Sequence, residues 1–306
     1  MRQHGPGPAP AAGENARGDL PRRRVRPTSG VMDIRQFIPP FRKRLPRVAV
    51  VRLHGAIGAT RPGAAGLSDA ALAPLLERAF RRGKPAAVAL VINSPGGSPV
   101  QSSLIAARIR RLADETKVPV HAFVEDIAAS GGYWLASAAD DIWADATSLV
   151  GSIGVISAGF GFAGLLERHG VERRVHTAGA SKSFMDPFRP EKPEDVARLT
   201  ALLEPMHAVF KAQIVARRGA KLAEGRDLFT GDIWIGAQAL EVGLIDGLAH
   251  MVPKLKELYG DKVRLVPYGI RRSIWRRFGV AAAADGALGA ALDLAEERAL
   301  WARYGL

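Results

Sequence analysis

A serine followed by two glycines is the arrangement in this chain that is best suited to covalent chemistry. Ser130 stands in Ala128-Ala-Ser-Gly-Gly-Tyr-Trp134, near the start of a segment, Ile127–Ala139, that we expect to be helical. Small neighbours leave the hydroxyl open, and the adjacent N–H groups are free to stabilise an oxyanion, which suits acyl transfer. The other interpretation is an ordinary helix N-cap with glycines for close packing. The Gly-x-Ser-x-Gly pattern of α/β-hydrolases is absent.

A serine nucleophile needs a base, and the attractive candidate is Lys182. None of the seven histidines lies in a pattern that marks a catalytic partner, although a Ser-His-Asp triad stays open. Lys182 lies in Gly179-Ala-Ser-Lys-Ser-Phe-Met-Asp-Pro-Phe188, where no other charged residue occurs before Asp186. Burial lowers the pKa of a lysine, and the neutral amine can then replace histidine as general base.

Two further glycine-rich turns follow predicted strands, where α/β proteins bind ligands. Ser94-Pro-Gly-Gly97 follows the predicted strand Ala87–Ile92 and can direct backbone N–H groups towards a bound group. An ordinary strand-to-helix turn would have the same sequence. Gly159–Gly164 matches Gly-x-Gly-x-x-Gly, but the next predicted strand, Glu172–His176, is followed by no acid. We therefore do not expect a dinucleotide site.

Alternating strands and helices are expected to position these turns. Apolar runs predict strands, and amphipathic stretches predict helices. The predicted strands are 48–53, 87–92, 118–124, 142–144, 153–156, 172–176 and 263–266, and the predicted helices are 67–82, 98–114, 127–139, 161–169 and 193–218. This alternation indicates an α/β protein with a largely parallel, buried sheet.

The composition excludes several classes of function. The 306 residues include no cysteine, which excludes disulfide scaffolds, thiol catalysis and thiolate metal sites. No apolar run reaches the roughly 18 residues that a membrane-spanning helix needs, and the polar first 46 residues show no secretory signal. We expect a cytoplasmic protein that uses no metal and no cofactor.

The net charge of +13 first suggests a nucleic-acid partner, but its distribution argues against one. Residues 1–47 carry eleven Lys and Arg against three acids, and residues 254–277 carry eight against two. Residues 48–253 carry 22 bases and 21 acids, so the body is nearly neutral. The basic flanks either solubilise the protein or attract it to an anionic surface such as the inner face of the cell membrane.

Several ordered motifs resemble the signal peptide peptidase A family of Ser–Lys serine peptidases, in the fold group of Clp proteases and crotonases. The similar segments, between about residues 48 and 255, are Asn93-Ser-Pro-Gly-Gly-Ser98, Ala128-Ala-Ser-Gly-Gly-Tyr133, Gly151-Ser-Ile-Gly-Val-Ile156, Lys182-Ser-x-x-Asp-Pro-Phe188, Val215-Ala-x-Arg-Gly219, Phe229-Thr-Gly231 and Gly236-x-Gln-Ala-Leu-x-x-Gly-Leu-Ile-Asp246. The resemblance implies a Clp protease/crotonase-like α/β fold with repeated ββα units and a largely parallel sheet.

The resemblance also implies roles for single residues. Ser130 becomes the nucleophile, Lys182 the general base, and Ser152 the hydroxyl that holds the lysine amine. The N–H groups of Gly97 and Gly131 become the oxyanion hole. The residues expected to line the bound peptide, held as an added strand, are Ser94, Pro95, Gly96 and Gly132. The implied reaction is hydrolysis, through an acyl-enzyme, of signal peptides or other unfolded or membrane-released peptides.

We expect three parts and a homo-oligomer. The parts are a basic extension (1–46), a Ser–Lys peptidase domain (47–267) and a basic, amphipathic tail (268–306). Relatives with one such domain form rings in which the serine and the lysine come from neighbouring subunits. In the tail, Ile270–Phe278 and Leu288–Tyr304 are expected either to contact anionic lipid or to pack on a neighbouring subunit.

Two other functions stay open. A crotonase-like acyl-CoA enzyme would share the fold and the oxyanion geometry but would need no Ser–Lys pair. A catalytically degenerate relative would serve as an oligomeric scaffold at the membrane surface, although both members of the dyad are present in this chain.

Overall fold

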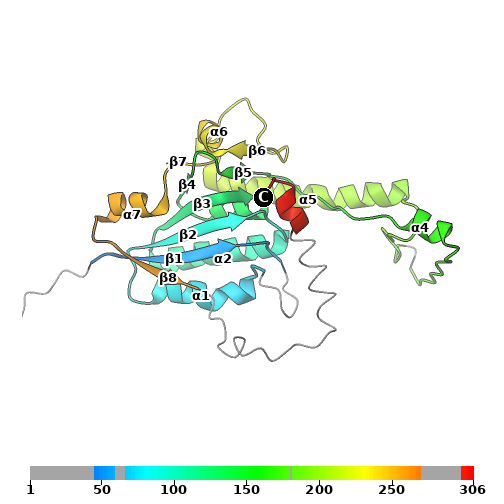
Figure 1. Cartoon of the computed structure of the whole chain (residues 1–306), viewed down its shortest axis with the longest axis horizontal. Coiled ribbons are helices and arrows are strands. Elements are labelled where there is room, and N and C mark those ends of the chain that lie inside the picture. Colours follow the sequence, from blue (N-terminus) through cyan, green and yellow to red (C-terminus); the bar gives the residue numbers. More distant parts are fainter. Residues whose placement is uncertain (1–44, 59–65, 180, 270–297) are drawn as a thin grey trace, which may run out of the picture. The chain divides into compact units, whose positions relative to one another are not determined.

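The computed structural model describes residues 45–58, 66–179, 181–269 and 298–306, which build an α/β fold around a mostly parallel sheet (Figure 1). The elements are β1 (Arg47–His54), α1 (Asp69–Arg81), β2 (Ala87–Ser94), α2 (Pro99–Thr116), β3 (Val120–Ala129), α3 (Gly131–Ser137), β4 (Asp141–Ala144), β5 (Leu149–Gly151), α4 (Ala163–Arg168), α5 (Pro193–Arg218), the 3-10 helix η2 (Gly219–Lys221), β6 (Ile233–Ile235), α6 (Gly236–Glu241), β7 (Gly247–Leu248), α7 (Met251–Tyr259) and β8 (Arg264–Tyr268). The predicted fold class is confirmed.

Strand β3 organises the sheet around the predicted nucleophile. The strand order is β6-β5-β3-β2-β1-β8, with β4 also paired to β3 and β7 to β4. Every pair is parallel except β5 with β6. The first half of β3, residues 121–124, pairs with β4, whereas residues 127–129 pair with β5. This division places the end of β5 directly beside the residue that follows β3, which is Ser130.

The ββα units can be followed along the chain. After β4, strand β5 follows without an intervening helix. In the units that begin with β1 and β2, isolated bridges take the place of the second strand. Ile57, after β1, forms one bridge with Leu67 and another with Gly97, which follows β2. The unit that begins with β1 continues into α1, and the unit that begins with β2 continues into α2.

Helices cover the two faces of the sheet unequally. Helices α1, α2 and α3, together with the C-terminal third of α5, build the larger core on one face. On the other face a smaller cluster gathers around Leu255 of α7. Helix α1, predicted from residue 67, begins at Asp69, and the Ser68 Oγ caps it by accepting the Ala71 N–H at 3.3 Å. Its buried residues lie on one face and are Leu72, Leu75, Leu76, Ala79 and Phe80.

Three predicted elements differ from the structure. The strand predicted at 153–156 is wrong, because the strand in this region is β5 at Leu149–Gly151, where residues pair with β3. The strand predicted at 172–176 is also wrong: these residues are mostly exposed and have no neighbouring strand to pair with. The helix predicted from Ile127 starts only at Gly131, because residues 127–129 complete β3.

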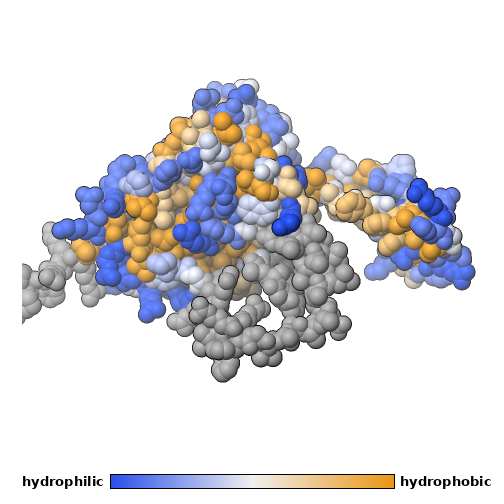
Figure 2. Space-filling model, viewed as in Figure 1, coloured by the Kyte–Doolittle hydropathy of each residue, from blue (hydrophilic) through white to orange (hydrophobic). Residues whose placement is uncertain are grey.

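Residues 157–209, which we call the arm, contribute no buried residue among those that the structure describes. The arm contains α4 and the first seventeen residues of α5, and hydrophobic side chains are visible along it (Figure 2). Its most exposed large apolar side chains are Phe160, Leu165, Val171, Leu202, Met206 and Val209. At Phe210 helix α5 joins the core, where the Phe210 ring stacks on Trp134 of α3 with the centroids 4.7 Å apart.

Replacement of Phe210 should therefore loosen the joint between α5 and α3. Phe210→Ala removes a ring that is 2% exposed, and we expect the free energy of unfolding to fall by about 3–5 kcal/mol. Val209→Ala, next to it in the chain but 57% exposed, should change stability by less than about 0.5 kcal/mol. Urea denaturation measures both; equal effects would contradict this packing arrangement.

The predicted N-terminal extension, except for residues 45 and 46, and most of the tail, including Ile270–Phe278, lie outside the described residues. The boundaries at residues 47 and 267 therefore stay predictions. Of the predicted amphipathic segment Leu288–Tyr304, the structure describes only the part from residue 298, which begins with a short helix.

Candidate active site

Ser130 occupies the junction between β3 and α3 in a backbone conformation that serine rarely adopts. Its φ is +52° and its ψ is −121°, and its N–H donates to the Gly151 carbonyl at 2.8 Å. Such conformations are costly and concentrate at functional sites. The side chain makes no capping hydrogen bond to α3, although Ser130 holds the N-cap position. The hydroxyl is therefore not engaged as an ordinary helix cap.

The glycine turn after β2 packs directly against Ser130. A Cβ on Gly96 would lie 2.8 Å from the Ser130 Cβ, and a Cβ on Gly97 would lie 1.9 Å from the Ile57 carbonyl oxygen. Both glycines also have positive φ, +102° and +141°, which disfavours any side chain. Only glycine lets the turn approach the serine this closely.

The two predicted oxyanion donors come together beside Ser130. A Cβ on Gly131 would lie 3.4 Å from the Gly97 nitrogen, so the two residues are in van der Waals range. The Gly97 N–H donates to no acceptor among the described residues. Gly131 is the first residue of α3, and a helix leaves the N–H of its first turn unpaired. Two free donors beside an open hydroxyl can stabilise a tetrahedral oxyanion.

The four residues predicted to line the peptide are buried in this chain. Ser94 is fully buried, and its Oγ accepts the Gly96 N–H at 3.3 Å. A Cβ on Gly132 would lie 2.4 Å from the Ser94 carbonyl oxygen, so only a glycine at position 132 fits against Ser94. Pro95 and Gly96 are buried too, whereas Gly97 is exposed. These residues shape the turn, and their contact with a substrate stays a prediction.

Ser152 lies next to Ser130 because β5 pairs with the end of β3. Ala129 is opposite Gly151 in the ladder, and Ser152 follows with φ +51° and its N–H bonded to Asp232 O at 2.7 Å. The Ser152 Oγ is 3.5 Å from the Tyr304 hydroxyl. Sequence reasoning missed this contact with the tail, since no spacing connects residues that are so far apart in the chain.

Lys182 lies in the arm, away from this cluster. It is exposed, in a turn spanning residues 181–185, and its amine forms no hydrogen bond or ion pair with any residue that the structure describes. From Pro193 to the first buried contact at Phe210, α5 runs seventeen residues, or about 25 Å at 1.5 Å per residue. The structure thus joins Ser130, Ser152, Gly97 and Gly131 but does not bring Lys182 of the same chain to them.

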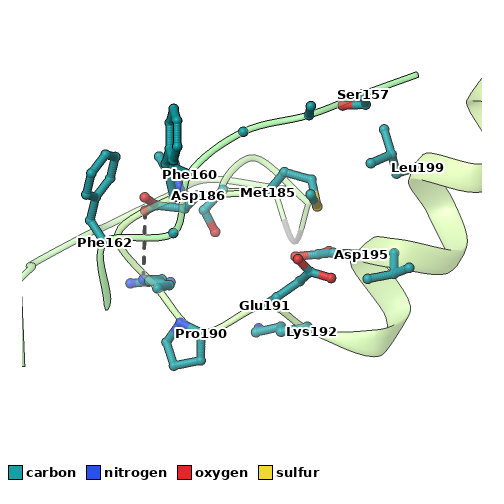
Figure 3. Close-up of a pocket in the computed structure, with 17 residues that line it drawn as sticks. Ser157, Phe160, Phe162, Met185, Asp186, Pro190, Glu191, Lys192, Asp195 and Leu199 are labelled. Carbon is teal, nitrogen blue, oxygen red and sulfur yellow. Dashed lines mark ion pairs between the residues drawn. The ribbon is translucent and has the colours of Figure 1, made fainter. Parts of the chain in front are cut away.

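The arm contains a cavity of about 770 Å³ beside the turn that carries Lys182 (Figure 3). Residues 157–162 line one side and residues from 183 to 199 line the other. Asp186 orders this region, since it pairs with Arg173 at 3.4 Å and accepts the Phe188 N–H at 3.1 Å. The Phe162 and Phe188 rings stack at 5.5 Å. The cavity contains none of the predicted catalytic side chains.

The histidines do not offer Ser130 a base within the described chain. His121 is tied to Asp141 and Tyr259, His207 to the Ile153 carbonyl, and His250 to Asp145. None of the described histidines hydrogen-bonds Ser130. The triad that the sequence left open therefore has no support in this chain.

A search of the described helices finds none that is long and apolar enough to cross a membrane.

An open serine at a strand-to-helix junction of an α/β sheet, with two free N–H groups beside it, defines a candidate serine hydrolase site. The comparisons with known proteins specify the family. The model of peptidase family S49 matches residues 113–259, which include β3, Ser130, Ser152 and Lys182. A Synechocystis sp. protein described as a putative protease is 33% identical over 235 residues, covering 75% of this chain and 80% of its own length. The chain belongs to peptidase family S49, with signal peptide peptidase A-like relatives.

Two other relatives are much longer than this chain. The chloroplastic serine protease SPPA of Arabidopsis thaliana is 32% identical over 212 residues, covering 67% of this chain and 31% of that protein. A Brucella melitensis protein named Na(+)/H(+) antiporter NhaA is 50% identical over 289 residues, covering 89% of this chain. The chain spans only 39% of that Brucella protein.

The close approach at Gly131 gives a test of the oxyanion geometry. A Cβ there would lie 2.3 Å from the Ser102 Oγ, so Gly131→Ala should displace the donor and slow labelling of Ser130 by a fluorophosphonate, by about 100-fold. Ser102→Gly removes the obstructing hydroxyl and should restore part of the rate in the double variant. Full reactivity of Gly131→Ala alone would show that this N–H does not face the reacting oxygen.

Proposed function

We propose that this chain is a serine endopeptidase that uses a Ser130–Lys182 dyad. The observation that carries the proposal is the strained Ser130 with the Gly97 and Gly131 N–H groups beside it. Membership of a peptidase family supports peptide bonds as the substrate class. The resemblance to signal peptide peptidase A favours signal peptides and other unfolded or membrane-derived peptides among these.

The proposed reaction proceeds in two steps. The neutral Lys182 amine takes the Ser130 proton as the Oγ attacks the carbonyl carbon, and the Gly97 and Gly131 N–H groups stabilise the oxyanion. The lysine then gives this proton to the leaving amine, which leaves an acyl-enzyme on Ser130. Water, deprotonated by the same amine, hydrolyses the ester. Ser152 would hold the amine by a hydrogen bond, as its position beside Ser130 allows.

We further propose that each complete site contains Lys182 from a second copy of the chain. In one chain the arm turn lies beside Arg198 of α5, twelve residues or about 18 Å before the core contact at Phe210. The arm also leaves large apolar side chains exposed, among them Leu202, Met206 and Val209 on α5. Exposed apolar surface of this kind is typical of an interface. Packing against a neighbouring subunit would cover these side chains and would remove the Lys182 amine from solvent.

Variants of the dyad test the chemistry. Ser130→Ala and Lys182→Ala should each abolish cleavage of an unfolded apolar peptide, with a loss of at least about 10³-fold in kcat/KM. Lys182→Arg should be equally inactive, because a guanidinium does not lose its proton at neutral pH. Lys192→Ala, an exposed lysine of the same arm, serves as the control and should retain activity. Thioester hydrolysis that survives Ser130→Ala would instead indicate a crotonase-like enzyme.

Mixing the two inactive variants tests the shared site. A subunit with Lys182→Ala keeps its serine, and a subunit with Ser130→Ala keeps its lysine, so mixed oligomers contain complete sites. We expect co-refolded variants to recover about a quarter of wild-type activity if subunits mix at random and sites act independently. Activity that stays at the level of the single variants, in oligomers shown by native mass spectrometry to be mixed, would place both residues of a site in one chain.

A further inference from the structure

The nucleophile helix α3 is tied to the rest of the molecule by a buried polar contact that the proposed chemistry does not use. Tyr133, three residues after Ser130, is fully buried, and its hydroxyl donates to the Leu244 carbonyl at 2.7 Å. Burial raises the pKa of this phenol well above its ordinary value, so the hydroxyl remains a donor. Leu244 lies 111 positions further along the chain, in the segment that follows α6.

The segment around Leu244 is in turn held by Arg218 at the end of α5. The Arg218 Nε donates to the Gly243 carbonyl at 2.8 Å, and its Nη1 pairs with the Asp246 carboxylate at 2.8 Å. Arg218 is only 4% exposed. Asp246 also accepts the Ile142 N–H at 2.8 Å, and its hydrogen bonds to cations and backbone outweigh burial and lower its pKa. The carbonyl that receives Tyr133 is thus fixed from both sides.

The other end of α3 is held by the neighbouring arginine. The Arg217 Nε donates to the Ser137 carbonyl at 3.0 Å, and its Nη2 donates to the Ala139 carbonyl at 2.8 Å. The Arg110 Nη1, from α2, donates to the carbonyl of Ala138, which lies between these two residues, at 3.1 Å. Cations at a helix C-terminus satisfy carbonyls that the helix leaves unpaired and complement its dipole. Two consecutive residues of α5 therefore reach both the C-terminal end of α3 and the segment that anchors its Tyr133.

This arrangement bears on Ser130 because α3 is short and the residue that precedes it, Ser130, is strained. The helix has seven residues, all buried, and Ser130 precedes it with a positive φ. A strained conformation persists only where the surroundings over-determine it. Contacts that fix α3 along its length can supply that constraint, and a shift of the helix would move the hydroxyl relative to the Gly97 N–H.

We propose that Tyr133, Arg217 and Arg218 are positioning residues that hold the Ser130 nucleophile in its reactive geometry. The inference rests on the proposed function. It also assigns a purpose to two motifs that the dyad leaves unexplained, Val215-Ala-x-Arg-Gly219 and the segment ending in Gly-Leu-Ile-Asp246, which meet at the Arg218–Asp246 pair.

The test compares two tyrosines that each lose one hydrogen bond of 2.7 Å. Tyr133→Phe removes the bond to Leu244 O, and Tyr259→Phe removes the bond to His121 at the remote α7. A misplaced nucleophile costs rate, so Tyr133→Phe should lower kcat and the fluorophosphonate labelling rate about 10-fold, with KM within about twofold. Tyr259→Phe should leave both rates within about twofold of wild type at a comparable thermal midpoint, because it lies away from α3.

A second pair keeps the inference testable if Tyr133→Phe fails to fold. Arg217→Lys retains the charge but loses the two-pronged contact with Ser137 O and Ala139 O, and it should lower kcat in the same way. Arg111→Lys, on the exposed face of α2, is the matched control. Equal kcat values in each variant and its control would overturn the positioning role. If the wild-type protein shows no activity that depends on Ser130, the proposed function is overturned instead.

Discussion

Helix α5 sets the constraint on which the rest of the site depends, because only its C-terminal third packs on the core. Phe210 stacks on Trp134, Arg217 binds the C-terminal end of α3, and Arg218 binds the segment after α6. Everything that precedes Phe210 in the arm is unburied among the described residues. The turn that carries Lys182 lies in this exposed part of the chain, away from the Ser130 of the same chain. The proposed dyad would therefore need two copies of the chain.

The serine half of the site depends on backbone contacts that tolerate no side chain. Gly96 touches Ser130, Gly97 touches Ile57, and Gly131 lies against Ser102 and the Gly97 nitrogen. Because the donors are backbone N–H groups on rigid elements, they are fixed before a substrate arrives. The β3–β5 ladder adds Ser152 on the other side. Ser130 therefore lies in a preorganised environment, and the proposed neighbouring subunit would supply the lysine amine.

Much of this arrangement could be predicted from the sequence, because it follows from local signals. Periodic apolar runs predicted the α/β class, and glycine pairs after strands predicted the turns at Gly97 and Gly131, which the structure brings together. The errors have one physical cause. The segments 153–156 and 172–176 have strand-like composition, but strand formation needs a neighbouring edge, and neither segment has one among the described residues. Helix α3 begins later in the chain than predicted because the neighbouring strands β5 and β2 pair with residues 127–129, which therefore belong to β3.

Contacts between distant parts of the chain could not be predicted from the sequence. Nothing in the spacing of Tyr133, Arg218 and Asp246 indicates that they share one buried network, nor that Tyr304 approaches Ser152. The exposed position of Lys182 could not be predicted either, because its sequence neighbours are small and apolar. The proposed shared site would account for the lack of charged neighbours around Lys182.

The absence of cysteine from the chain makes a direct measurement of this geometry possible. Single-cysteine variants Ser130→Cys and Lys182→Cys can be mixed and treated with a short bifunctional thiol reagent, since a lysine side chain keeps the two Cα atoms beyond the reach of a disulfide. If neighbouring subunits complete each site, the mixture should yield a cross-linked dimer that contains one copy of each variant. A chain that carries both substitutions and cross-links only within itself, with no dimer from the mixture, would contradict the account.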